Sequence, residues 1–387
     1  MKWVSLKLGE VIDIKHGYAF KSEFFTDSGL YILLSPGNCH EEGGLKLKGD
    51  KEKFYSGEFP PEYLMSEGDM LVVMTDLINT APILGGAFMI PENNRFLHNQ
   101  RLGLVQITDV MRIDKGFLYY LLNSHNYRAQ VRGSASGATV RHTAPTRIKE
   151  CVVRVPRDVS YQKKVGSILS FYDAIIENNR RRIALLEESA RLLYREWFVH
   201  LRFPGHEHTH IIDGVPKGWE RVALESTLVL QRGFDLPTQS REEGTVPIYG
   251  STGILGYHNK AKACAPGIVT GRSGTLGEVQ YVDEDYWPLN TTLWIKEFKR
   301  VSPFFALFLL RELDLKQFNG GSSVPTLDRK TVHRQNVLIP SPVLGRAFDE
   351  FALPIFAQIK NITSQSEKLR TARDLLLPRL LSGELAV

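Results

Sequence analysis

The amino-acid sequence predicts an α+β protein in which two similar globular domains are separated by two long helices that pair as an antiparallel coiled-coil stalk. Three observations support this class. The sequence repeats itself over a long distance, each repeat mixes short strand-like runs with helical ones, and each repeat closes with a long amphipathic helix. Such a duplication gives a single chain an approximate internal two-fold axis.

The two halves of the sequence match each other at two different offsets. Near the start of each half the offset is 216, which matches Gly17 to Gly233, and near the end it is 184. The second globular segment is therefore 32 residues shorter, since 216 minus 184 is 32. We expect the second register to run without a gap into the long helices, where Leu169 matches Leu353. One frame with different interiors is typical of two copies of a module that bind different targets, and chance similarity of amphipathic segments is the alternative.

The globular segments are predicted to span residues 1–157 and 217–341. Runs such as GIVTGRSGTLGEVQYV alternate as strands do, whereas GFLYYLLNSHNYRAQV and PFFALFLLREL have helical spacing. Turns containing Gly and Ser separate these runs, so an α+β arrangement fits better than a regular βαβ series. Residues 201–216 are polar and contain Gly and Pro, and we expect a linker there.

The long helices are predicted at residues 158–200 and, together with a C-terminal tail, at 342–387. In the first, apolar residues step alternately by four and three over more than four heptads, which indicates a coiled-coil seam. In the second, Pro354 is expected to kink the helix or to mark the start of its regular part. Pro378 and Gly383 are expected to stop it. The predicted seam positions are Leu169, Tyr172, Ile176, Ile183, Leu186, Leu193, Ile355, Ile359, Ile362, Leu369 and Leu376.

Composition narrows the class. With 43% hydrophobic and 24% charged residues, the chain of 387 residues has enough apolar side chains for sizeable cores. A formal charge of +5 allows a nucleic-acid partner without establishing one. Cys39, Cys151 and Cys264 have neither zinc-ligand spacing nor an even count, so we predict no metal and a reducing, cytoplasmic location. No membrane segment is expected.

The predicted architecture suits DNA sites made of two parts. A helix from about residue 161 to 200 spans roughly 60 Å at ~1.5 Å per residue. That length corresponds to at most ~17 base pairs at ~3.4 Å each, so half-sites one helical turn apart lie within it. The stalk would set the spacer between two half-sites, and different domain interiors predict different half-site sequences.

Several segments resemble one known family. The run VPIYGSTGILGYHNKAKACAPGIVTGRSGTLGEVQYVDEDYWPLNTTLWIK, with QRGF before it and GSSVPTLDRKTVHRQNVLIPSP after it, resembles the target-recognition domain of type I restriction-modification specificity subunits. The segments IIENNRRRIALLEESARLLYREWFV and EKLRTARDLLLPRLLSGEL are similar to the two spacer helices of that family. The resemblance covers the whole chain in the order domain, helix, linker, domain, helix, and is weaker between about residues 31 and 101.

The resemblance implies a non-catalytic DNA-specificity subunit that binds double-stranded DNA. It implies two methyltransferase subunits on the helical stalk and restriction subunits joined to them. S-adenosylmethionine, ATP and Mg²⁺ are then expected on those partners and no cofactor on this chain. Whether the partners are separate or fused subunits stays open, as does the DNA sequence that is read.

Candidate DNA contacts lie in Gly-rich loops, where the backbone can approach phosphates closely and polar side chains can reach bases. The loop GSASGATVRHT recurs as NGGSSVPTLDRK just ahead of the last strand of each domain; hydroxyls that cap local backbone are the alternative. The motif GRSGTLG is not a phosphate-binding P-loop, so we expect a tight hairpin there. In that hairpin Arg272 has either a structural role or faces DNA. The predicted DNA-binding residues are Lys21, Arg132, Ser136, Thr139, Arg141, Arg232, Tyr249, Arg272, Ser322, Ser323 and Lys330.

Other polar clusters are given plainer interpretations. His206, His208 and His210 alternate in the linker and are read as solvated residues rather than metal ligands. Residues 180–182 are three consecutive arginines that cannot share one helix face, so solvent exposure is the default and partner docking the alternative.

Two other functions are the alternatives: an enzyme such as a methyltransferase or nuclease, and a scaffold that does not touch DNA. An adenine methyltransferase needs an Asn/Asp-Pro-Pro-aromatic element and a Gly-rich cofactor turn, and neither occurs in the sequence. Residues 283–285, the carboxylates nearest to a nuclease pattern, are read as a hairpin tip. A scaffold that does not touch DNA would have no need of duplicated domains with different interiors. Because neither a methyltransferase nor a nuclease pattern is found, we predict no catalytic residues in this chain.

Overall fold

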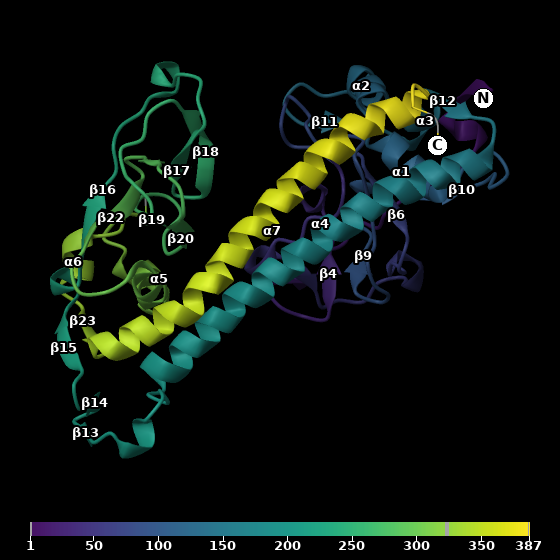
Figure 1. Cartoon of the computed structure of the whole chain (residues 1–387). Helices are drawn as coiled ribbons and strands as arrows, with labels where there is room; N and C mark the ends of the chain where they lie inside the picture. Colours follow the sequence, from purple (N-terminus) through teal and green to yellow (C-terminus); the bar gives the residue numbers. More distant parts are fainter. Residues whose placement is uncertain (1, 322–324, 386) are drawn as a thin grey trace. The chain divides into compact units, whose positions relative to one another are not determined.

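The computed structural model describes residues 2–321, 325–385 and 387, and it divides into two compact units (Figure 1). The first unit comprises Met1–Asn178 together with Gln365–Val387, and the second comprises Asn179–Ser364. Each unit therefore contains one globular segment and a part of both long helices.

The first unit is built on a four-stranded antiparallel sheet. The apolar strand β6 (Met70–Val73) lies inside it with all four residues buried, as expected for a strand covered on both faces. A separate pair joins β1 (Trp3–Lys7) to β12 (Val152–Pro156). The sheet has the order β2 (Ile12–His16), β10 (Leu102–Ile107), β6, β8 (Ala87–Met89).

The second unit repeats this topology. A pair joins β15 (Glu220–Ala223) to β23 (Asn336–Ile339), as β1 joins β12. Its four-stranded sheet has the order β16 (Leu228–Arg232), β22 (Thr292–Phe298), β19 (Gly267–Gly271), β20 (Val279–Val282). The same strand order in both units confirms the predicted α+β class with two similar domains.

Smaller sheets complete each unit, and in both of them one pair is parallel. Two short antiparallel pairs are also present, one in each unit. In the first unit the small sheet has the order β3 (Phe25–Thr26), β5 (Phe54–Tyr55), β4 (Tyr31–Leu33), β9 (Phe96–Leu97). In the second it is β18 (Gly253–His258), β17 (Val246–Gly250), β21 (Trp287–Pro288). The short pairs are β7 (Thr75–Asp76) with β11 (Arg141–His142), and β13 (Ile211–Ile212) with β14 (Val215–Pro216).

Short helices pack against the sheets, and four of the five begin at a polar capping residue. Asp114 accepts a hydrogen bond from the backbone N–H of Phe117, and Ser302 accepts one from Phe305. The helix that Ser302 caps buries an almost continuous apolar run in the core of the second unit. The short helices are α1 (Lys115–Leu122), α2 (His125–Ser134), α3 (Pro145–Lys149), α5 (Pro303–Glu312) and α6 (Arg329–His333).

The long helices are α4 (Val159–Tyr194), which continues into a π-helical turn, and α7 (Pro342–Ser382). In the first unit the start of α4 packs against the end of α7, where Leu380 and Leu381 join the core. In the second unit the end of α4 packs against the start of α7, where Phe348 is fully buried. Within each unit the two helices therefore run antiparallel.

The structure places every predicted seam position toward the protein interior. Leu169 and Ile362 are buried and the other nine are half-buried, as is expected where two helices meet. Phe171, Leu185 and Leu192, which lie off the seam, are exposed. Polar contacts also join the two helices in the first unit. Asp173 on α4 accepts a hydrogen bond from Arg373 Nη1 on α7 at 2.5 Å and another from the Tyr120 hydroxyl at 2.6 Å.

Three features of the helices differ from expectation: Pro354 does not mark the start of α7, Pro378 does not end it, and the repeat does not keep one register. Helix α7 begins ahead of Pro354 and runs through it and through Pro378, ending only before Gly383, whose φ is 78°. Both prolines are exposed, so their rings face solvent rather than the packed side. The repeat also loses its register at the start of the helices. Val165 is buried, and its counterpart by burial is Phe348, at offset 183 instead of 184.

Candidate nucleic-acid interface

A basic hollow in the second unit brings together three of the predicted DNA-binding residues. Arg232, Arg272 and Lys330 come from separate segments of the sequence, and all three line a cavity of about 390 Å³. Arg329, which the sequence did not single out, is a fourth cation in the same lining. The other lining residues are Leu293, Gly320, Thr326, Leu327 and Asp328.

Backbone hydrogen bonds on both sides fix Arg272. It directly follows strand β19, and its N–H donates to the carbonyl of Thr291 at 2.8 Å. Its own carbonyl accepts from the N–H of Leu327, also at 2.8 Å. The half-buried side chain makes one long contact, from Nη1 to the carbonyl of Asn290 at 3.5 Å. Within the described residues, this contact uses one of the five N–H donors of the guanidinium.

Helix α6 supplies the other wall. Its cap, Asp328, accepts hydrogen bonds from the Thr331 side chain and from the backbone N–H groups of Lys330 and Thr331, which hold the pKa of this carboxyl below its ordinary value. The cap places Arg329 and Lys330 in the first turn, where both are exposed. Arg329 Nη1 lies 3.5 Å from the carbonyl of Leu230.

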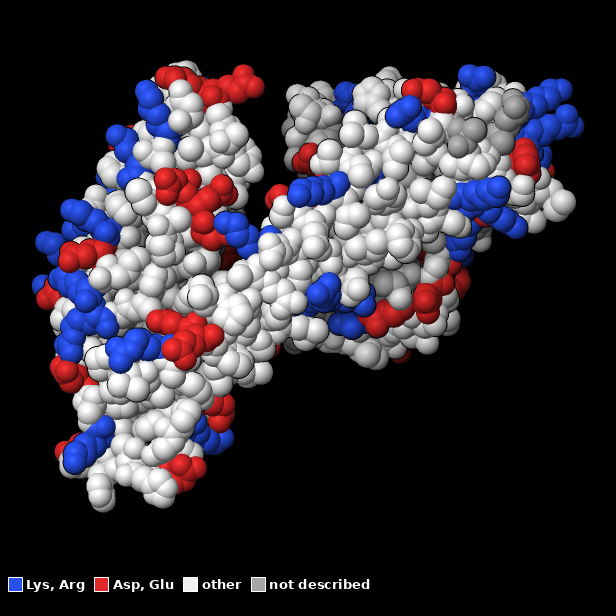
Figure 2. Space-filling model, viewed as in Figure 1, with Lys and Arg blue, Asp and Glu red and all other residues white. Residues whose placement is uncertain are grey.

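The hollow carries net positive charge. Asp328 supplies the carboxylate among its described lining residues, and that group is engaged in capping α6. Arg232 lies 3.9 Å from Asp235, at the limit of an ion pair. Blue side chains gather along the edge of this unit that carries β16 and α6 (Figure 2). Such a surface attracts an anionic ligand.

In the first unit, the predicted residues of the Gly-rich loop split into two groups. Arg141 donates to the carbonyls of Gly137 at 3.2 Å and Arg132 at 3.0 Å, so its side chain braces the loop. The Ser136 hydroxyl accepts a hydrogen bond from Arg147 at 3.0 Å. Thr139 is exposed at the loop, as a side chain that reaches a base must be, while Arg132 is half-buried at the end of α2.

The remaining predicted contacts lie elsewhere. The prediction for Tyr249 is corrected. The residue is 9% exposed, its ring packs at 5.8 Å against the ring of Tyr286, and burial raises its pKa to about 12. A side chain held in the core in this way does not reach a base edge. Lys21 is exposed and lines a different hollow in the first unit, among aromatic rings that include Phe24 and Phe59. Ser322 and Ser323 lie outside the described residues.

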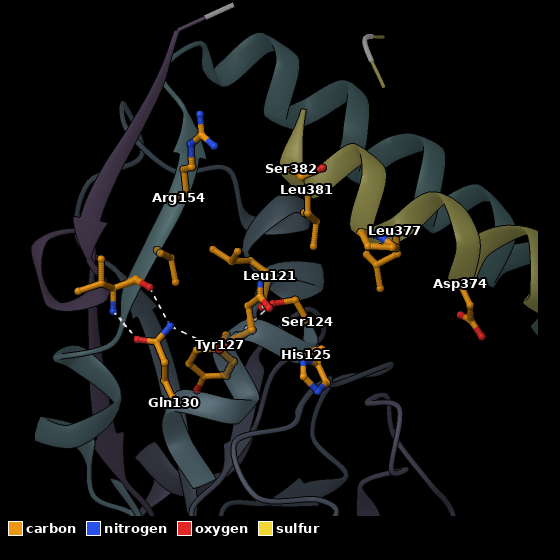
Figure 3. A pocket seen from close by; sticks show the side chains of 14 residues that line it. Leu121, Ser124, His125, Tyr127, Gln130, Arg154, Asp374, Leu377, Leu381 and Ser382 are labelled. Carbon is orange, nitrogen blue, oxygen red and sulfur yellow. Dashed lines mark hydrogen bonds between the residues drawn. The ribbon is translucent and has the colours of Figure 1, made fainter. Parts of the chain in front are cut away.

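A larger apolar hollow of about 680 Å³ lies in the first unit (Figure 3). Leu121, Leu377 and Leu381 line it from α1 and α7. The amide of Gln130 exchanges two 2.9 Å hydrogen bonds with the backbone of Val152. His125 and Asp374 also line the hollow, and Asp374 is paired with Arg373 at 2.8 Å.

Metal-ligand clusters and membrane-spanning helices are both absent from the described residues. Within the described ranges, no three His, Cys, Asp or Glu side chains converge as a metal site requires. His206 bonds to the carbonyl of Phe203 at 2.8 Å, and His208 and His210 are exposed. Asp283 pairs with Lys360 at 3.0 Å. For the part of the chain that the structure describes, no helix has the length and apolar character needed to cross a bilayer.

Duplicated α+β units, paired long helices and a basic hollow define a two-module protein with the features of a DNA-binding subunit. Residues 1–188 and 216–344 match the family model described as the type I restriction modification DNA specificity domain. Because these ranges cover most of the sequence, the chain belongs to that family, and it is a type I restriction-modification DNA-specificity subunit.

Individual relatives agree with the assignment. The chain is 24% identical over 300 residues to the MjaIX type I restriction enzyme specificity subunit of Methanocaldococcus jannaschii, covering 70% of this chain and 69% of that one. It is 22% identical over 405 residues to a putative type I specificity subunit of Mycoplasma pneumoniae, covering 98% and 96%. The crystal structure of a type I specificity subunit from M. genitalium has the same fold, with a TM-score of 0.61 at 18% identity and coverage of 98% and 96%.

Proposed function

We propose that this subunit reads an asymmetric DNA site in two parts, one half-site with each unit, and that the long helices set the spacer between them. The observation that supports this is that the two units share the same backbone hydrogen bonds at matching positions but carry different side chains there. In the first unit the N–H of Met74 donates to the carbonyl of Arg101, and its carbonyl accepts from Thr143. Arg272 makes the same two bonds in the second unit, with Thr291 and Leu327.

The matching positions therefore carry different chemistry. Met74 is apolar and buried where Arg272 is cationic and half-buried. At offset 184, Thr146 stands where the second unit has Lys330. Two frames of equal topology with different side chains at the same end suit two different half-sites.

We further propose that two methyltransferase subunits dock on the long helices and that restriction subunits join them. Leu185 and Leu192 on α4 are 69% and 49% exposed and lie seven residues apart, so they share one face in the second unit. An apolar face of this kind suits contact with partner helices. Adenine methylation, ATP use and DNA cleavage would then belong to the partners, with S-adenosylmethionine, ATP and Mg²⁺ bound there and this chain non-catalytic.

The decisive experiment is genome-wide adenine methylation in cells that carry this gene and a neighbouring methyltransferase gene. Deleting this gene alone is expected to abolish methylation at one asymmetric two-part motif. The same experiment identifies the motif. Methylation that persists unchanged while the methyltransferase is active would contradict the proposed function and favour a scaffold.

A second test concerns the spacer. Seven residues are inserted between Asn178 and Asn179 and seven between Ser364 and Gln365, where the two units divide, so that each core is left intact. Each helix then lengthens by about 10 Å at ~1.5 Å per residue. The spacer of the methylated motif is expected to lengthen, by at most about 3 base pairs at ~3.4 Å each, with both half-sites unchanged.

The control for the spacer test is the same insertion in α4 alone. It shifts the seam of one helix against the other, and we expect it to abolish methylation. An unchanged spacer in the chain with both insertions would contradict the role of the helices as a ruler.

A further inference from the structure

The cationic side chains of the basic hollow in the second unit have few ion-pair and hydrogen-bond partners among the described residues. Arg272, Arg329 and Lys330 form no ion pair within the described part of the chain, and the hydrogen bonds of both guanidinium groups to carbonyls are 3.5 Å long. Neighbouring cations repel one another, so a cluster of this kind is stabilised when an anion binds among them.

The shape of the site decides which part of DNA can enter it. Base edges in the major groove lie at the bottom of a channel roughly 8.5 Å deep, so a side chain that reads them must project from the protein. Arg272 instead lies half-buried in the wall of a hollow, fixed through its own backbone on both sides. Only a group that projects from the duplex can reach such a guanidinium, and on DNA that group is a backbone phosphate.

At the positions that match the four cations of this hollow, the first unit has no Lys or Arg. The backbone hydrogen bonds around Met74 are those around Arg272, yet Met74 is 2% exposed and carries no charge. At offset 216, His16 stands where the second unit has Arg232, and at offset 184 Pro145 stands where it has Arg329. The cationic hollow is therefore an addition to a shared frame rather than a requirement of the fold.

We propose that the hollow formed by Arg232, Arg272, Arg329 and Lys330 is a seat for one backbone phosphate beside the half-site of the second unit. This contact contributes to the affinity and position of the DNA without reading a base. As a result, the two half-sites contribute unequally to the affinity. This inference rests on the proposed function, because it presupposes that the second unit contacts DNA.

The test uses the full chain in complex with its methyltransferase partner and a duplex that contains the methylated motif. The variant is Arg272→Met, because the first unit shows that methionine fits this backbone frame. DNA affinity is expected to fall about 10- to 100-fold, the effect of losing hydrogen bonds to a charged group. The dependence of log K on log salt is expected to become shallower by about one unit. The methylated motif should stay the same at every position.

Two controls isolate the site. Arg334→Met removes one exposed charge from the residue that follows α6 but does not line the hollow, and it is expected to leave affinity almost unchanged. Arg272→Lys keeps the positive charge but loses the planar guanidinium with its forked N–H donors. The DNA affinity of this variant should therefore lie between those of the wild type and Arg272→Met.

Neutral methylphosphonate groups placed singly along the duplex then locate the phosphate. One position beside the second half-site should weaken binding by the wild-type complex, and the same substitution should have a clearly smaller effect on the Arg272→Met complex. Relaxed sequence preference at one base in the Arg272→Met variant would overturn the proposal, since it identifies a base reader. Affinity equal to that of Arg334→Met would also overturn it. A wild-type complex with no sequence preference at all would instead contradict the proposed function.

Discussion

Replacing Phe348 by alanine is expected to lower the free energy of unfolding of the second unit by about 3–5 kcal/mol. The side chain is fully buried where α7 meets α4 and α5. Its ring centroid lies 5.3 Å from that of Phe198, 5.8 Å from Tyr194 and 6.0 Å from Phe308. Removing it opens a cavity that surrounding aromatic rings, rigid and already packed, cannot close.

Urea unfolding followed by tryptophan fluorescence measures this effect. Four of the five tryptophans lie in the second unit, so the signal reports mainly on that unit. The matched control is Phe351→Ala on the same helix, where the side chain is 46% exposed and the expected change is within about 0.5 kcal/mol. Equal losses for the two variants would mean that the contact between the helices and the second unit is not a core contact.

A methyl group at Gly233 is expected to cost about 3 kcal/mol, even though its backbone is not in the left-handed region. A Cβ at this position would lie 2.1 Å from the carbonyl oxygen of Leu289 and 2.5 Å from that of Pro288. These atoms cannot move aside easily, because Phe234 N–H donates to the Pro288 carbonyl at 2.8 Å. Gly17 has the same close approach in the first unit, 2.1 Å from the carbonyl of Asn99.

The same fluorescence measurement compares Gly233→Ala with Gly345→Ala. A Cβ at Gly345, inside α7, would meet no atom within 4 Å. That control is expected to stabilise the protein by roughly 0.5–1 kcal/mol, because alanine favours a helix more than glycine does. Destabilisation of Gly345→Ala as large as that of Gly233→Ala would show that loss of glycine, and not the steric contact, is responsible.

Much of the fold could be predicted because repetition and periodicity are properties of the sequence itself. The matched Gly17 and Gly233 occupy the same kind of close backbone contact, which explains why both halves need glycine there. The long helices were expected from their heptads, but Pro354 misled the interpretation. A proline removes one hydrogen bond from a helix, and packing of Phe348 and Phe356 on either side of it outweighs that loss.

The site was less predictable, since it depends on which loops meet. Arg232, Arg272 and Lys330 were selected from Gly-rich segments, but only the fold brings them to one hollow. Arg329 could have been found from its place beside Lys330 after a capping aspartate. Tyr249 was selected for its Gly-rich neighbours, a signal that does not distinguish a surface loop from a strand end that turns its ring into the core.

The division of the long helices between the units affects how the chain is completed on the ribosome. The core of the first unit includes Leu380 and Leu381, and Tyr161 donates its hydroxyl hydrogen to the carbonyl of Leu385 at 2.8 Å. Residues 179–364, the whole of the second unit, are synthesised before these groups exist. Domains usually fold in order of synthesis. The globular segment that is translated first therefore cannot complete its core until residues 380–385 have also been synthesised.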